Sequence, residues 1–66
     1  MKKLKDIREG QALMIESEST INYYIRGESS NGRVHVKCYT ADHKRYSWLD
    51  RHLLRSKKVM MIKLQA

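Results

Sequence analysis

The dipeptide Asn31-Gly32 constrains the fold of this chain more than any other feature, because a strand-like stretch lies on each side of it. Asn-Gly is the preferred pair for the two-residue turns that join antiparallel strands. Residues 33–40 alternate apolar and polar side chains, and residues 20–26 are rich in β-branched and aromatic ones. Both compositions favour strands. The sequence therefore predicts a β-hairpin at the centre of the chain.

Three further elements are expected around this hairpin. Residues 11–16 form a short apolar run that follows Gly10 and suits a buried strand. Residues 59–64 are apolar at nearly every position, which predicts a last strand that is central in the sheet or buried on both faces. Residues 1–9 read as a flexible arm or a short turn of helix.

A short helix is predicted over residues 47–55. Ser47 and Asp50 have the spacing of a capping box, in which the two side chains satisfy backbone groups at the start of a helix. Trp48 and Leu53 would then pack inward on one face of this helix. Trp48 is accordingly expected in the core.

The predicted fold class is mainly β, as a small α+β domain. Four to five short antiparallel strands are expected in a twisted sheet or a small SH3-like barrel, with one helix near 47–55 before the last strand. The whole chain, 1–66, reads as a single small basic domain. A chain of this size has a thin core. Cys38 is the only cysteine, so no intrachain disulfide supports the core, and good packing, a homodimer or a partner must do so.

A two-residue turn at Asn31-Gly32 predicts which side chains share a face. Continued along the hairpin, this register sets Arg26 opposite Lys37 and Tyr24 opposite Tyr39. Like charges opposed across a ladder are unfavourable unless an anion lies between them. Cations beside tyrosines suit nucleic acid, since cations neutralise phosphates and aromatic rings stack with bases.

The net charge of +7 is the strongest indication of a binding partner. Such an imbalance points to association with polyanions. A second basic cluster lies between Lys44 and Lys58, where Arg51 and Arg55 would share one face of the predicted helix. The residues expected to bind nucleic acid are Tyr24, Arg26, Arg33, His35, Lys37, Tyr39, Lys44, Arg45, Arg51, Arg55, Lys57 and Lys58.

The leading hypothesis is therefore a small accessory or regulatory protein that binds DNA or RNA. The runner-up is a protein-interaction module or inhibitor that docks on an acidic surface of a larger protein. A third reading is a solvated sheet face in which the two tyrosines only stabilise the hairpin.

Enzymatic activity is not expected. The three histidines do not have metal-ligand spacing with a carboxylate, and no phosphate-binding glycine loop occurs. Cys38 alternates with valines and is expected to be buried and inert. No cofactor, no metal and no membrane association are expected, and the lone cysteine with the absence of a signal peptide predicts a cytoplasmic protein.

Overall fold

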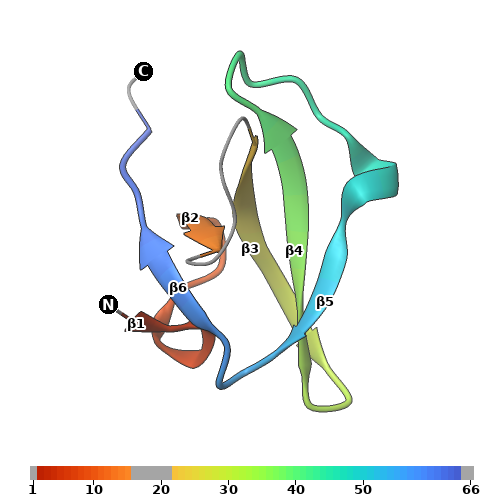
Figure 1. Cartoon of the computed structure of the whole chain (residues 1–66). Helices are drawn as coiled ribbons and strands as arrows, with labels where there is room; N and C mark the ends of the chain where they lie inside the picture. The colour runs from red at the N-terminus through yellow and green to blue at the C-terminus, as the bar shows by residue number, and fades with distance from the viewer. Residues whose placement is uncertain (1, 16–21, 65–66) are drawn as a thin grey trace.

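A computed structural model describes residues 2–15 and 22–64, which form one six-stranded antiparallel sheet (Figure 1). The strand order across the sheet is β1-β6-β2-β3-β4-β5. The elements in chain order are β1 (Lys2–Lys3), the 3-10 turn η1 (Leu4–Asp6), β2 (Ala12–Ile15), β3 (Asn22–Ser30), β4 (Arg33–Thr40), the 3-10 turn η2 (Ser47–Leu49), β5 (Arg51–Leu54) and β6 (Lys58–Met61).

The mainly β fold class is confirmed, as an open antiparallel sheet of short strands. At one end of the sheet, the turn η1 that follows β1 lies beside the segment that joins β5 to β6. There the backbone N–H of Lys5 donates to the carbonyl of Arg55 at 2.9 Å, and that of Leu4 donates to Lys57 at 2.8 Å. The segments that follow β1 and β5 are therefore fixed beside each other.

The central hairpin is confirmed, and β4 has the bounds that the alternation predicts. Asn31 and Gly32 have φ values of 52° and 76°, the left-handed conformation that both central residues of a type I′ turn require. Ser30 pairs with Arg33 directly across this turn. Beyond Ser29, however, the predicted register is wrong.

The register shifts at a β-bulge between Arg26 and Ser29. Arg26 pairs with Val36 and Ser29 with Val34, so two residues of β3 oppose the single residue His35 of β4. A shift of one residue turns every following side chain to the other face of the sheet.

Tyr24 consequently pairs with Cys38 and lies in the core with 8% of its surface exposed, instead of facing Tyr39 on the outer face. Tyr39 pairs with Tyr23, and Lys37 pairs with Ile25 rather than with Arg26. Arg26 and Lys37, the two cations predicted to lie opposite each other, therefore do not pair.

The core draws on the turn η1 with its C-cap residue and on the five strands β2 to β6. Cys38 is fully buried, as expected. The expected arm at residues 1–9 contains a short turn, and this turn contributes Leu4 and Ile7 to the core. The core cluster comprises Leu4, Ile7, Leu13, Ile15, Tyr24, Val34, Val36, Cys38, Leu53 and Val59.

The helix predicted over 47–55 is wrong. Ser47–Leu49 form a single 3-10 turn without a side-chain cap, and the chain then continues as β5 along the edge of β4. Leu53 is buried as expected, but it reaches the core from a strand. Trp48 is 74% exposed, so its expected place in the core is wrong too.

The last strand is shorter and more exposed than predicted. β6 covers Lys58–Met61 and pairs with both β1 and β2. Val59 is fully buried, but Met60, Met61 and Leu64 are among the most exposed apolar side chains of the described residues. Burial on both faces is thus wrong for this strand.

The bulge yields a direct test of the register. We expect Tyr24→Ala to cost about 3–5 kcal/mol of unfolding free energy, as for other large side chains removed from a core. Ile25→Ala, on the opposite face of the same strand, should cost less than about 2 kcal/mol. Urea denaturation of both variants measures this difference. A larger loss for Ile25→Ala than for Tyr24→Ala would favour the unbulged register.

Candidate nucleic-acid interface

Rings and charged groups form a continuous row on the outer face of β3, β4 and β5. Tyr23 and Tyr39 stack with ring centroids 5.5 Å apart, and the guanidinium of Arg45 lies 5.4 Å from the centroid of the Tyr39 ring. Further along, His35 stacks on His52 at 4.8 Å. Cross-strand pairing produces these contacts, because residues directly opposite each other in antiparallel strands share a face.

Asp50 connects the two parts of this row. Its carboxylate accepts hydrogen bonds from the backbone N–H of Cys38 at 2.8 Å and from Nε2 of His35 at 2.8 Å. Both terminal nitrogens of Arg45 donate to it at 2.6 Å, in a bidentate pair. The Asp50 side chain is only 13% exposed, so these partners replace most of its hydration.

The pKa of Asp50 therefore lies well below its ordinary value. The hydrogen bond from Arg45 is the largest cause and outweighs partial burial, which acts in the opposite direction. The Cys38 N–H and His35 add to the lowering. The same pairing raises the pKa of Arg45. Arg45 and His35 are thus engaged in holding the fold, although the sequence analysis assigns both to ligand binding.

Basic residues are concentrated instead at the end of the sheet where η1 lies beside the segment that joins β5 to β6 (Figure 1, lower end). The hairpin turn, the segment joining β5 to β6, and η1 all lie at this end. We call this region the basic end; it comprises Lys5, Arg26, Arg33, Arg55, Lys57 and Lys58. Residues 4–9, 26–33 and 54–58 also carry Arg8 and three carboxylates, those of Asp6, Glu9 and Glu28, so seven cations minus three anions leave an excess of four.

A depression of about 350 Å³ opens at the basic end. Lys5, Arg26 and Arg55 come to it from three separate segments, and the hairpin turn completes its wall. Among the residues that the structure describes, those lining this depression include no carboxylate. The lining residues are Lys5, Arg26, Ser29, Ser30, Asn31, Gly32 and Arg55.

Arg26 is the most firmly held of the three cations. Its Nη1 donates to the carbonyl of Gly27 at 2.7 Å, and its Nη2 donates to the hydroxyl of Ser29 at 2.9 Å. The Oε1 atom of Glu9 lies 3.6 Å from Nη1 of Arg26. Residues of the bulge thus orient the guanidinium beside the depression before any ligand arrives.

The predicted site residues do not form one surface. Arg26, Arg33, Arg55, Lys57 and Lys58 lie at the basic end, and His35, Lys37, Tyr39 and Arg45 lie on the outer face or at its edge. Tyr24 is in the core, and Arg51 pairs with Val36 on the core side of β5. In the loop after β4, the Nζ atom of Lys44 lies 3.8 Å from the Oδ2 atom of Asp42.

Sequence reasoning missed Lys5 and Trp48 as surface groups of interest. Lys5 lies within the expected arm, and only its backbone bond to Arg55 brings it to the basic end. Trp48 was expected in the core because it precedes apolar residues in an apparent helix. No signal in the local sequence indicates that residues 51–54 extend the sheet instead.

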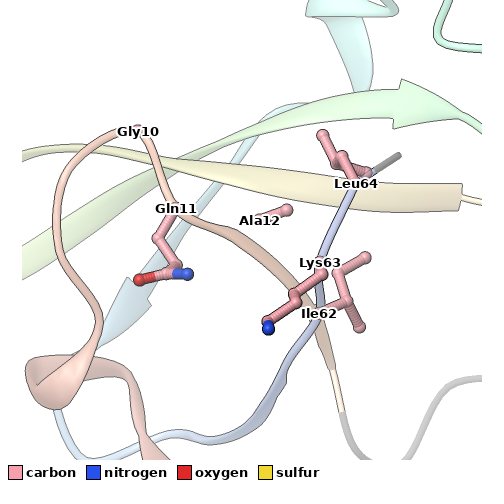
Figure 2. A pocket seen from close by; sticks show the side chains of 6 residues that line it. All are labelled: Gly10, Gln11, Ala12, Ile62, Lys63 and Leu64. Carbon is pink, nitrogen blue, oxygen red and sulfur yellow. The ribbon is translucent and has the colours of Figure 1, made fainter. Parts of the chain in front are cut away.

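A second depression, of about 280 Å³, lies between the start of β2 and the segment that follows β6 (Figure 2). Gln11 and Lys63 are the polar side chains that line it, beside Ile62 and Leu64. The backbone N–H of Ile62 donates to Ala12 at 3.1 Å and closes one side. With a single cation, this depression is a much weaker anion site than the basic end.

Within residues 2–15 and 22–64, no group of three His, Cys, Asp or Glu side chains is placed to hold a metal ion. The same residues contain no helix of the length and apolar character that crossing a membrane requires.

Comparisons with known proteins found no matching family model, no similar curated protein and no similar solved structure. The fold and the site together define a small basic protein built on an open antiparallel sheet, with a cationic depression at one end.

The role of Asp50 can be tested through stability. Because the folded-state pKa of Asp50 is depressed, its contribution is present above its unfolded pKa of about 3.9 and is lost as the pH falls below that value. We expect Asp50→Asn to lower the free energy of unfolding by about 2–4 kcal/mol at pH 7, because the variant removes the partly buried carboxylate charge that Arg45 and His35 share. The difference from the wild type should narrow below about pH 4.

Urea denaturation across this pH range measures both effects. Asp42→Asn is the matched control, because Asp42 is an exposed carboxylate whose partners are Thr40 and Lys44. Equal losses for the two variants would show that Asp50 does not hold β4, β5 and the intervening loop together.

Proposed function

We propose that this protein binds nucleic acid through the sugar–phosphate backbone and that the basic end is where it does so. The observation that carries the proposal is the convergence of Lys5, Arg26 and Arg55 on one depression. Three cations held close together repel one another, and an anion between them removes that cost. Phosphate groups are the anions that arginine and lysine clusters bind best.

The rigidity of the basic end supports this proposal. Sheet hydrogen bonds fix the backbone around Lys5 and Arg55, and the bulge fixes the guanidinium of Arg26. A pre-organised site loses less conformational entropy on binding than a flexible basic tail does. Arg33, Lys57 and Lys58 extend the positive surface beyond the depression, as a ligand with several phosphates requires.

The acidic-protein alternative uses the same cations, so the experiment must separate the two. Retention of partners from a lysate, with and without nuclease, distinguishes them. Loss of the bound material after nuclease treatment supports nucleic acid, whereas retention of one acidic protein would overturn the proposal in favour of an interaction module.

Purified components test the location of the site. Three neutralised phosphates predict that the logarithm of affinity falls with the logarithm of salt concentration with a slope of about −2 to −3. Lys5→Gln should reduce this slope by about 1 and weaken binding about five- to tenfold at 0.1 M salt. Fluorescence anisotropy of a labelled 20-nucleotide oligomer measures both quantities.

Lys63→Gln is the matched control, because it removes the same charge from an exposed lysine at the second depression. We expect less than a twofold change in its affinity. Equal weakening by the two variants would mean that net charge, rather than the basic end, determines binding.

A further inference from the structure

Trp48 is the most exposed of the large apolar side chains in the described residues, with 74% of its surface accessible. It is also the only tryptophan in the chain. Burial of an aromatic side chain stabilises a small domain considerably, yet this fold leaves its largest one in solvent. Tryptophan rings are enriched at binding interfaces, where one part of the ring system is apolar and another is polar.

The ring is nevertheless fixed in place. Trp48 stacks on Tyr46 with ring centroids 4.9 Å apart and an interplanar angle of 20°. Tyr46 itself packs against the core, and its backbone N–H donates to the carbonyl of Cys38 at 2.9 Å. One face of the indole is therefore supported by the body of the protein, and the large exposed fraction shows that the other face is open.

The turn that carries Trp48 is closed at both ends. Within it, Leu49 N–H donates to Tyr46 at 3.0 Å and Asp50 N–H donates to Ser47 at 3.1 Å. The bidentate pair of Arg45 and Asp50 spans the turn from one side to the other. The turn therefore has little conformational freedom left to lose when a ligand binds the ring.

We infer that the open face of Trp48 is a stacking platform for an unpaired base, so that the nucleic acid bound at the basic end is single-stranded. This inference rests on the proposed function. Stacking of a base on an aromatic side chain contributes about 1–3 kcal/mol and requires a flat, exposed and supported ring. Bases within a duplex are already stacked and cannot offer a face to Trp48.

The charge of the surroundings favours a nucleic acid over a protein partner. Lys44, Arg45 and Arg51 flank the turn, against Asp42 and Asp50; Asp42 lies beside Lys44 and Asp50 binds Arg45 and His35, so both carboxylates are paired and three cations minus two anions leave an excess of one. A nucleic acid supplies both a flat apolar ring and phosphates. A protein would have to supply an apolar pocket and acidic groups together.

The platform and the basic end lie within reach of one strand of nucleic acid. β5 runs from η2 to the basic end (Figure 1). Arg55 follows Trp48 by seven residues, which at about 3.3 Å per residue sets at most about 23 Å between their Cα atoms. About seven stacked nucleotides cover that length at roughly 3.4 Å each. A 20-nucleotide oligomer is long enough to contact both.

The test compares a 20-nucleotide oligothymidine with an oligomer of equal length whose sugars carry no bases. Both offer the same phosphates, but only the first can stack. The wild type should bind oligothymidine about 5- to 150-fold more tightly, which is the fold-change equivalent of the stacking energy. The emission of Trp48 should be quenched by oligothymidine and not by the baseless oligomer.

Trp48→Ala should remove the preference for bases and leave the salt slope unchanged, whereas Trp48→Tyr should retain part of the preference. Leu49→Ala is the matched control, since Leu49 is an exposed neighbour without a ring, and its preference should equal that of the wild type. A 20-base-pair duplex should bind without quenching Trp48.

The possible failures are distinguishable. Equal affinity for the two oligomers, with no quenching, would overturn the stacking platform and leave phosphate binding at the basic end intact. Absence of binding to either oligomer would overturn the proposed function itself. Binding of an acidic protein that depends on Trp48, together with no preference for bases, would assign the ring to a protein partner and overturn the inference.

Discussion

The bulge of β3 at Gly27 and Glu28 determines which side chains of this strand face the core. Two residues stand there opposite His35, and the extra residue reverses the orientation of the strand beyond it. A side chain at Gly27 would approach the carbonyl oxygen of His35 to 3.2 Å, a tight contact against backbone that a sheet holds in place. Glycine therefore permits the close approach on which the register depends.

The consequences of this single insertion reach both proposed binding regions. It turns Tyr24 into the core cluster and leaves Tyr23, which is itself 7% exposed, to stack on Tyr39 on the opposite face of the sheet. It also separates Arg26 from Lys37, whose opposition across the ladder would have been repulsive. Arg26 is then directed toward the hairpin end, where the bulge itself supplies acceptors for the guanidinium. The same local irregularity thus relieves a like-charge contact and builds part of the cationic depression.

Local chemistry was sufficient to predict the turn, the bounds of β4 and the mainly β class. Asn31-Gly32 specifies its own backbone conformation, and strict alternation over residues 33–40 has only one reading. The bulge was not predicted, although a glycine inside a strand-like segment is a recognised sign of one. The strand-like composition was followed only over residues 20–26, which left Gly27 outside the predicted strand.

The helix predicted over residues 47–55 is wrong because tertiary contacts outweigh the local sequence pattern. Ser47 and Asp50 have capping-box spacing. The Asp50 carboxylate instead accepts hydrogen bonds from the backbone N–H of Cys38 and from the side chains of His35 and Arg45, all of which lie outside the predicted helix. These tertiary bonds outweigh a local cap, and β5 gains a full edge of β4 to pair with. Leu53 reaches the core from the strand, so no helix is needed to bury it, and Trp48 is left outside.

The distribution of acidic residues explains why a chain with so many cations presents them unevenly. Asp50 neutralises Arg45, Asp42 lies beside Lys44, and Glu9 lies beside Arg26. On the outer face, in the loop after β4 and beside Arg26 at the basic end, carboxylates are thus used to order cations within the fold. At the basic end, Lys5 and Arg55 meet where η1 lies beside the segment that joins β5 to β6, and the carboxylates of that end lie outside the lining of the depression. Because the pairing of β1 with β6 sets η1 beside this segment, the positive field at this end is a product of the topology, and it persists as long as that pairing is kept.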